Sequence, residues 1–234
     1  MLTLQDVGNK IKSKLKQHKK ILIFYLSKLT KKQVNPQQTN RASAFEMWIK
    51  SPMPMVTLTK TFDITHLIKF RKRKKLKLNM LLCWCIGKAA SNIEEFYLLP
   101  EKEELFQYDS LSINVIVPNK KGSISSCDIK YTEDLAQFNK DYLRLTQQVA
   151  EKSESIFEEE TMVIGTSAVV ATQIDSIVNQ YTDLFSNPML MWGKYYKKCF
   201  KQKLAISFQF HHVQMDGGQA AQFLEQLQKT INAL

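Results

Sequence analysis

Two adjacent histidines, His211 and His212, are the residues of this chain best suited to acid–base chemistry. They stand in the segment QFHHVQMDGG, where an apolar, strand-like run ends and Asp216 follows before two glycines. Successive residues of a strand point to opposite faces, so only one of the two rings can face a given side. A rigid strand end that is open to solvent suits a general base, and histidine exchanges protons near neutral pH. The alternative is a structural pair, with Asp216 accepting backbone hydrogen bonds within the turn.

The elements that would carry this segment alternate between strands and helices along the chain. Strands are expected at 56–62, 104–108, 111–118, 123–129, 162–172 and 204–212, and helices at 63–75, 79–93, 132–160 and 220–234. The segments 104–108 and 111–118 are expected to pair as a hairpin. Helix 79–93 is apolar nearly all round, which predicts deep burial. This order indicates one α/β domain with helices packed on a sheet.

The net charge of +11 is concentrated near the N-terminus. Residues 1–40 contain nine lysines and a single acidic residue, Asp6, whereas the rest of the chain is nearly balanced. Apolar residues recur over 4–29 at three-, four- and seven-residue spacing, which predicts a basic amphipathic helix. We therefore divide the chain into an N-terminal extension, 1–40, with a polar linker at its end (33–40), and a domain, 41–234.

This basic helix has two possible binding modes. Residues 1–32 can lie on an anionic membrane surface, with lysines on the lipid phosphates and the apolar stripe at the headgroup boundary. Alternatively, the stripe docks on the body of the protein or on a neighbouring subunit. Nucleic acid is not an expected partner, because no aromatic residues are interleaved for base stacking.

The composition is that of a soluble globular protein, with 44% hydrophobic and 24% charged residues. No apolar run approaches the roughly 18–20 residues that span a bilayer, and no signal-peptide pattern is present. The expected location is therefore the cytoplasm, with any peripheral attachment at the inner face of the membrane. The cysteines lack metal-finger spacing, so we expect buried free thiols, no metal site and no permanently bound cofactor. These cysteines are Cys83, Cys85, Cys127 and Cys199.

A second basic cluster lies at 69–77, where seven of nine residues are Lys or Arg. It ends one predicted helix and precedes another, and positive charges near a helix C-terminus complement the helix dipole. Seven charges exceed that need. The cluster can therefore also bind an anionic ligand such as a phosphorylated cofactor.

The segment HHVQMDG, which begins at His211, resembles the HHxxxDG signature of the chloramphenicol acetyltransferase family. The further segments that resemble the family are WGKYY at 192–196, as the strand before the signature, FLEQLQ at 223–228, as the C-terminal helix, and Asn40 and Arg41 with Phe45. The resemblance covers 41–234. It implies the α/β fold of that family, a two-layer sandwich in which helices pack on a mixed β-sheet.

The resemblance also implies roles for individual residues. His212, the second histidine, would be the general base that takes a proton from an acceptor hydroxyl while its oxygen attacks an acyl-CoA thioester. Asp216 would be chiefly structural, pairing with Arg41 and holding the loop around the histidine. A serine hydroxyl on a strand would stabilise the oxyanion of the tetrahedral intermediate. Ser167 lies nearest that position, and Thr166 is the alternative.

The acceptor pocket departs from the family pattern. Met191 stands where the family has a threonine near the reaction centre, and the segment 114–125 replaces a Phe- and His-bearing segment of the antibiotic pocket. Trp48 stands where the family has an aromatic wall residue. We therefore expect a retained catalytic frame and an altered acceptor pocket.

The family resemblance further implies acetyl-CoA or another acyl-CoA as cosubstrate. It also implies a homotrimer with active sites between subunits, the histidine coming from one side of the cleft. The candidate contacts to the CoA phosphates are Lys194, Tyr195, Lys74 and Lys75.

Three functions follow as hypotheses. The first is CoA-dependent O-acyl transfer to a small molecule, with chloramphenicol as one candidate acceptor. The second is hydrolysis of an N- or O-acyl bond in a lipophilic small molecule, with His212 activating water, at the membrane surface if residues 1–32 bind there. The third is a non-catalytic binding or scaffold subunit. The intact set of His212, Asp216 and Arg41 argues against this third hypothesis.

Overall fold

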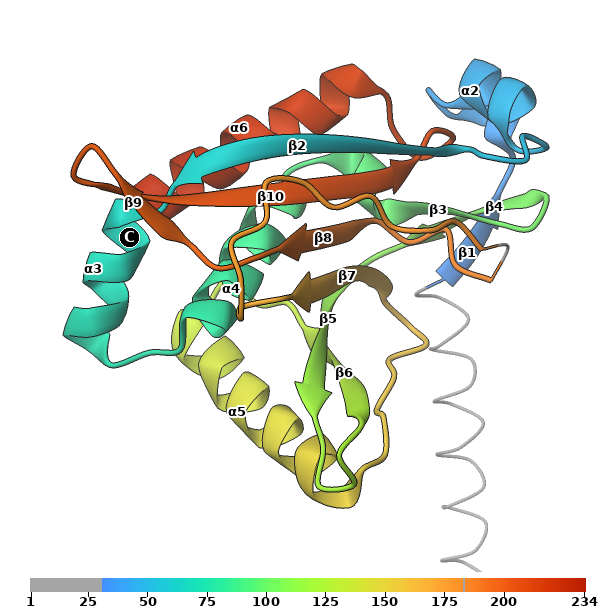
Figure 1. The fold of residues 1–234 in the computed structure, drawn as a ribbon. Helices are drawn as coiled ribbons and strands as arrows, with labels where there is room; N and C mark the ends of the chain where they lie inside the picture. The colour runs from blue at the N-terminus through green and yellow to red at the C-terminus, as the bar shows by residue number, and fades with distance from the viewer. Residues whose placement is uncertain (1–30, 183) are drawn as a thin grey trace, which may run out of the picture.

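The computed structural model of the chain describes residues 31–182 and 184–234 (Figure 1). The basic helix expected within residues 1–30 therefore lies outside the described residues. The strands are β1 (Lys31–Val34), β2 (Met55–Asp63), β3 (Leu98–Glu101), β4 (Glu104–Tyr108), β5 (Leu111–Pro118), β6 (Ile124–Lys130), β7 (Met162–Ala168), β8 (Met189–Trp192), β9 (Tyr196–Lys198) and β10 (Lys201–His211). The α-helices are α2 (Ala42–Trp48), α3 (Thr65–Lys74), α4 (Leu78–Ala90), α5 (Leu135–Lys152) and α6 (Gly217–Asn232), with short 3-10 turns η1 (Pro36–Gln38) and η2 (Glu94–Tyr97).

The main sheet is mixed and has seven strands, in the order β2-β10-β8-β7-β5-β6, with β9 paired to one end of β10. The parallel neighbours are β5 with β7 and β7 with β8, and the other pairs are antiparallel. The long strand β10 is central to the site, because its last residue is His211. It pairs with β2 over nine positions, from Lys203↔Asp63 to His211↔Met55, which fixes the orientation of the histidine end.

The longer helices α4, α5 and α6 cover one face of this sheet, and the core lies between the two layers (Figure 1). Alternate residues of β10 point into this core, because side chains alternate along a strand. These are Leu204, Ile206, Phe208 and Phe210, all buried. Helix α4 is buried along most of its length, as its uniformly apolar sequence predicts. The two-layer α/β sandwich expected from the sequence is confirmed.

A long connection, residues 169–188, lies on the opposite, helix-free face of the sheet. The Ile177 N–H donates to Ser207 Oγ at 2.8 Å, and the Gln209 side chain donates to the Asn179 carbonyl at 2.9 Å. Both Ser207 and Gln209 alternate with the core residues of β10, so the connection contacts the face without helices. In Figure 1 this connection runs in front of the strands.

The hairpin expected between 104–108 and 111–118 is wrong. β4 pairs with β1 and β3 in a separate three-stranded sheet, whereas β5 joins the main sheet between β7 and β6. Two residues, Asp109 and Ser110, let the chain turn from one sheet to the other. The apolar side of β5 then packs in the main core, and this burial outweighs a local hairpin.

The linker expected at 33–40 is also wrong, because this segment is part of the folded body. β1 pairs with β4 in register from Lys31↔Tyr108 to Val34↔Leu105. Asn35 then caps η1 by accepting the N–H of Gln37. The boundary at residue 40 thus falls inside ordered structure.

Two expected elements are shorter than their sequence patterns. Helix α5 ends at Lys152 rather than at residue 160, because Ser153 adopts a left-handed conformation with φ of 58°. The acidic residues that follow leave the helix, and Ile156 bridges to Cys127 of β6. Strand β7 likewise stops at Ala168, where the connection across the helix-free face begins. No helix in the described part of the chain is long and apolar enough to cross a membrane.

Candidate active site

Arg41 is buried beside the loop that carries His212 and Asp216, residues 212–216. Its guanidinium donates to both Asp216 carboxylate oxygens, at 2.7 and 2.9 Å. Two further N–H groups donate to the His212 and Val213 carbonyls, each at 2.9 Å. Only 3% of Arg41 is exposed, so these four bonds satisfy a charge that would otherwise be costly to bury. The ion pair expected between Arg41 and Asp216 is present.

Asp216 joins the loop to the last helix. It is the N-cap residue of α6, and its own N–H donates to the Gln219 side chain at 3.0 Å. Hydrogen bonds from Arg41 hold the pKa of the Asp216 carboxyl below its ordinary value of 3.8, against the raising effect of partial burial. The carboxylate is therefore ionised throughout the neutral range, where it can balance positive charge on the nearby histidine.

The His212 ring stacks on Trp48 at the end of α2. The ring centroids are 4.6 Å apart and the planes differ by 8°. The backbone N–H of His212 donates to the Pro54 carbonyl at 2.8 Å. Its Nδ1 lies 3.1 Å from Asp216 Oδ1 but points out of line with it, so this contact is electrostatic rather than a directed hydrogen bond. A ring held in this way can exchange a proton without losing its position.

His211 has a different environment. It is 2% exposed, and its Nδ1 accepts the N–H of Val213 at 3.1 Å. Burial lowers the pKa of His211 from 6.5 to about 4, with a further contribution from the charge of His212. His211 is therefore neutral and structural, which leaves His212 as the histidine that is open to a substrate.

Ser167 lies on β7, on the helix-free face of the sheet. Along this strand the core residues alternate with less buried ones, and Ser167 belongs to the second set. Among the described residues its hydroxyl has no hydrogen-bond partner. Thr166 faces the core instead and donates its hydroxyl to the Asn114 carbonyl at 2.7 Å. Of the two candidate donors, only Ser167 is thus free to meet a ligand.

Ser167 and His212 do not meet within one chain. Strand register places Ser167 opposite Met191 and Met191 opposite Ser207, four residues before His211 on β10. Two strand spacings and four residue rises give a separation of roughly 17 Å between Ser167 and His211, and His212 follows one residue further on. The candidate residues therefore form two groups. We call Arg41, Trp48, His212 and Asp216 the histidine cluster, and Ser167 and Met191 the serine cluster.

Lys194 and Tyr195 follow β8 in a tight segment, not in the continuous strand that the family resemblance implies. The Lys194 N–H donates to the Thr172 carbonyl at 2.7 Å. A Cβ added to Gly193 would lie 2.8 Å from the Ile174 nitrogen, so only glycine fits here without a shift. Strand pairing resumes at Tyr196 in β9.

Lys74 and Lys75 lie far from His212 in the same chain. They end α3, whose first residue, Thr65, accepts the N–H of Gln202 near the start of β10. His211 ends that strand, nine residues later and roughly 30 Å away. The basic cluster at 69–77 is thus at the opposite end of the molecule from the histidine cluster (Figure 1).

A cavity of about 940 Å³ opens on the helix-free face. It is bordered by Met55 and Gln209 near the histidine end and by Gly165 and Met189 near the serine cluster. Asp128, only 3% exposed, lines it and accepts bonds from the Asn114 side chain at 2.7 Å and the Glu158 N–H at 2.9 Å. Burial raises the pKa of the Asp128 carboxyl.

A polar network closes another side of this cavity. Lys31 Nζ lies 2.7 Å from both carboxylate oxygens of Glu101, and the Tyr108 hydroxyl donates to the same carboxylate at 2.7 Å. These residues come from β1, β3 and β4, so the small sheet forms one wall. The arrangement provides an open concave space whose lining combines apolar side chains with many polar ones, and a small molecule fits such a space.

The comparison with known proteins identifies the family. The family model described as chloramphenicol acetyltransferase matches residues 29–228. The chain belongs to the chloramphenicol acetyltransferase family. It is 26% identical over 183 residues to chloramphenicol acetyltransferase 3 of Escherichia coli, a match that covers 76% of this chain and 85% of that protein. It is 28% identical over 181 residues to the Bacillus pumilus enzyme, covering 75% and 82%. Membership makes the chain an acyltransferase.

Solved structures agree on the fold. A chloramphenicol acetyltransferase superposes with a TM-score of 0.73 at 16% identity, covering 86% of this chain and 99% of that one. The dihydrolipoamide acetyltransferase of Azotobacter vinelandii gives a TM-score of 0.61 at 19% identity, covering 82% and 86%. The match of the family model from residue 29 also agrees with the structured position of β1.

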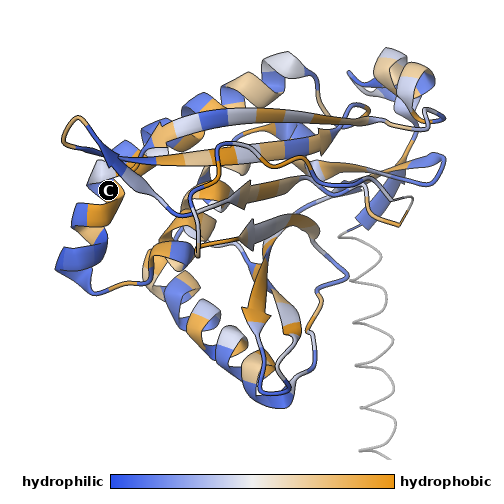
Figure 2. Ribbon diagram, viewed as in Figure 1, coloured by the Kyte–Doolittle hydropathy of each residue, from blue (hydrophilic) through white to orange (hydrophobic). Residues whose placement is uncertain are grey.

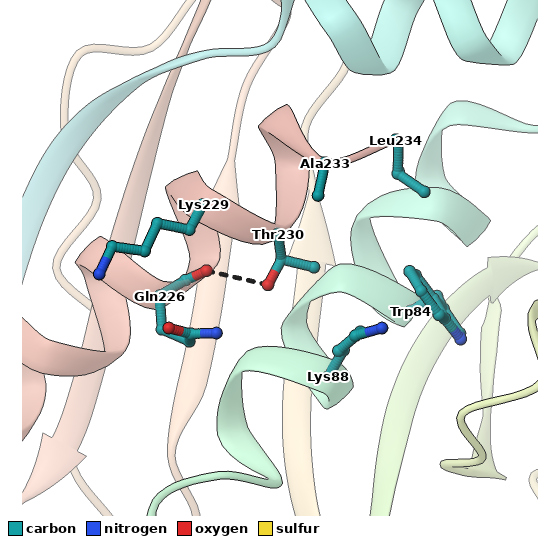
Figure 3. Close-up of a pocket in the computed structure, with 7 residues that line it drawn as sticks. All are labelled: Trp84, Lys88, Gln226, Lys229, Thr230, Ala233 and Leu234. Atoms are coloured by element: carbon teal, nitrogen blue, oxygen red, sulfur yellow. Dashed lines mark hydrogen bonds between the residues drawn. The ribbon is translucent and has the colours of Figure 1, made fainter.

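A smaller pocket of about 220 Å³ lies between α4 and α6 in the helix layer (Figure 3). Trp84 and Lys88 border it on one side and Lys229 and Thr230 on the other, and the Thr230 hydroxyl donates to the Gln226 carbonyl at 2.9 Å. It contains no residue of the family signature. This pocket therefore offers no link to the residues expected to carry the chemistry.

The sequence analysis missed the polar residues of the large cavity. Asp128 gives a local signal, because it is charged and stands between two apolar residues of a strand, Cys127 and Ile129. Glu101, Lys31 and Tyr108 give none, because they meet only through the pairing of β1, β3 and β4. The cysteines are free thiols as predicted, although Cys199 is exposed and not buried. Within residues 31–182 and 184–234, no cluster of three or more His, Cys, Asp or Glu side chains could hold a metal ion.

Proposed function

We propose that this acyltransferase moves an acyl group from acyl-CoA, most simply acetyl-CoA, to a hydroxyl group of a small molecule, with His212 as general base. Neutral His212 takes the hydroxyl proton while the oxygen attacks the thioester carbon. When the tetrahedral intermediate collapses, the carbon–sulfur bond breaks and the imidazolium returns the proton to the departing thiolate. The histidine cluster is the observation that carries this proposal, because Arg41, Asp216 and Trp48 hold that one ring.

The oxyanion donor in this proposal is Ser167 of a second copy of the chain. A free serine hydroxyl on the helix-free face can donate to the developing oxyanion. Since Ser167 lies roughly 17 Å from His211, which precedes His212, a complete site needs two copies, and a closed trimer provides three equivalent sites. Exposed apolar side chains on the connection across this face support a subunit contact there. They are Val169, Val170, Val178, Leu184 and Phe185.

The acceptor in this proposal occupies the cavity of about 940 Å³. Within one chain Trp48 and Met191 do not line this cavity, and we propose that they contact the acceptor from the histidine cluster and the serine cluster. Chloramphenicol is the first candidate, because it is the substrate named for the relatives. The buried carboxylate of Asp128 favours acceptors with several hydrogen-bond donors. The proposed contacts for the CoA phosphates are Lys194, Tyr195, Lys74 and Lys75. They lie toward the end of the molecule where β10 begins, which is rich in positive charge.

The proposal includes a cytoplasmic location and contact of residues 1–32 with an anionic membrane surface, which the lysines of that segment support. Hydrolysis by His212 is not favoured. The relatives are acetyltransferases, and a base that activates water needs no second substrate pocket of this size.

The experiment follows thiol release from acetyl-CoA by the purified full-length chain, with chloramphenicol and with other hydroxyl-bearing acceptors. Release should depend on an acceptor and should fall by about 10²–10⁴-fold in His212→Ala, the usual contribution of a general base. The matched control is His66→Ala, an exposed histidine on α3, which should keep full activity. Full activity of a well-folded His212→Ala would refute the assignment.

A further inference from the structure

The turn between β9 and β10 carries two apolar side chains, Cys199 and Phe200. Lys198 pairs with Lys201, so only these two residues lie between the paired positions. Both have positive φ, 46° and 63°, which is the conformation that hairpin turns normally fill with Asn-Gly. Residues with a Cβ are strained there. The fold alone therefore favours a different pair of residues at this tip.

Phe200 is 90% exposed, more than any other large apolar side chain in the described part of the chain. Its ring has one neighbour of note, the Lys197 ammonium, 5.7 Å from the ring centre. The ring therefore buries very little apolar surface against its own protein. A strained turn thus presents an aromatic side chain to the solvent with no gain in folding stability.

Lysines surround this tip on both strands. Lys197, Lys198 and Lys201 are exposed, and Figure 2 shows the apolar tip next to hydrophilic strand residues. Helix α3 lies at the same end, because the Ile64 N–H donates to the Gln202 carbonyl at 2.9 Å. Together, residues 61–77 and 194–203 contain twelve Lys or Arg and one acidic residue. This end is strongly basic although the domain as a whole is nearly balanced.

We propose that the β9–β10 hairpin docks on an anionic lipid surface and inserts Phe200 between the headgroups. The ring would enter the apolar boundary of the bilayer while the lysines reach the lipid phosphates. A lipid surface fits better than nucleic acid. Proteins that bind single-stranded nucleic acid stack the bases on a series of aromatic rings, whereas this hairpin tip exposes one aromatic ring, that of Phe200. The inference rests on Phe200 with Lys197, Lys198 and Lys201, and not on Lys74, Lys75 and Lys194, which are proposed CoA contacts, nor on residues 1–32.

The first test places a tryptophan at the tip of the full-length chain, as Phe200→Trp. Vesicles of phosphatidylcholine and phosphatidylglycerol, with and without brominated acyl chains, then report its depth. We expect a blue shift and bromine quenching of the added emission, measured as the difference from wild type. The control is Phe157→Trp, a site that is 66% exposed and followed by three glutamates, where we expect neither change. This readout is local, so binding by another segment does not mimic it.

An added tryptophan that stays unquenched, or that is quenched equally at position 157, would overturn the proposal. So would a Phe200→Trp signal that responds to RNA and not to vesicles.

The second test replaces the tip by the pair that this turn prefers, as Cys199→Asn with Phe200→Gly. We expect a higher Tm, because the strain is relieved, and vesicle affinity lower by about tenfold, because the apolar insertion is lost. Thiol release without vesicles should stay unchanged, which separates this proposal from the proposed function. Unchanged vesicle affinity in this variant would contradict the docking of the tip.

Discussion

At the scale of single residues, Arg41 connects parts of the chain that are far apart in sequence. Its guanidinium binds Asp216 and the carbonyls of His212 and Val213, more than 170 residues away. The same bonds fix the loop that carries the histidine and the carboxylate beside it. One buried cation thus couples folding stability to the geometry of the proposed base.

A double-mutant cycle on Arg41→Ala and Asp216→Ala tests this coupling. Removing either partner leaves the other charge without its main neighbour, so the two losses in unfolding free energy should overlap by about 1–3 kcal/mol. We expect a coupling energy near the lower end of this range, because the Asp216 side chain is 47% exposed and solvent screens the pair. Urea unfolding of the four proteins measures the coupling, and strictly additive losses would show that the pair is not energetically linked.

His211 predicts a dependence of stability on pH. Its folded-state pKa is lowered to about 4 from 6.5. Between these pH values the unfolded chain therefore binds a proton at His211 that the folded chain does not bind. The contribution of His211 to the free energy of unfolding is fully present above pH 6.5. It decreases by about 3 kcal/mol as the pH falls from 6.5 to 4. His211→Asn keeps a side-chain acceptor for the Val213 N–H but removes the titration. The difference in unfolding free energy between wild type and variant should change across this window. A constant difference would contradict the assignment.

At the scale of elements, the site depends on how the connection 169–188 is fastened to the sheet. Gly193 is the critical point, because Ile174 and Thr172 approach it closely. The bonds of Ser207 and Gln209 to Ile177 and Asn179 hold the rest of the connection. Together they shape the face that carries Ser167.

Gly193→Ala should therefore lower the unfolding free energy by about 1–3 kcal/mol, as overpacking does, and reduce thiol release. The matched control is Gly218→Ala in the first turn of α6, where an added Cβ meets nothing within 4 Å. That change should be neutral or stabilise by about 0.4–1 kcal/mol. Equal effects of the two substitutions on stability would show that the contact at Gly193 is not restrictive.

The sequence predicted the elements whose signal is local. The period-two strand β2, the apolar helix α4 and the HHxxxDG segment were all located by their own residues. What it could not predict were pairings decided by the core, such as β4 with β1 and not with β5. The expected strand through Gly193–Tyr195 failed for a related reason, since the packing of 169–188 against Gly193 is a tertiary effect. The residues of the large cavity were missed because they meet only in the folded sheet.

At the scale of the whole molecule, the two clusters lie on one chain but too far apart to act together. The histidine cluster lies at the end of β10, and the serine cluster lies two strands away and four residues back. Exposed apolar side chains on the helix-free face supply a surface for a second copy. The central claim is therefore that His212 of one copy works with Ser167 of another.

Complementation between two inactive variants tests this claim most directly. His212→Ala and Ser167→Ala are each purified, mixed in equal amounts, unfolded together and refolded, and thiol release is measured with an acceptor. If sites form between chains at random, about a quarter of them combine an intact histidine with an intact serine, so activity should return to about a quarter of wild type. Activity that stays at the level of the two separate variants would contradict the account, because it would place both groups in the same chain.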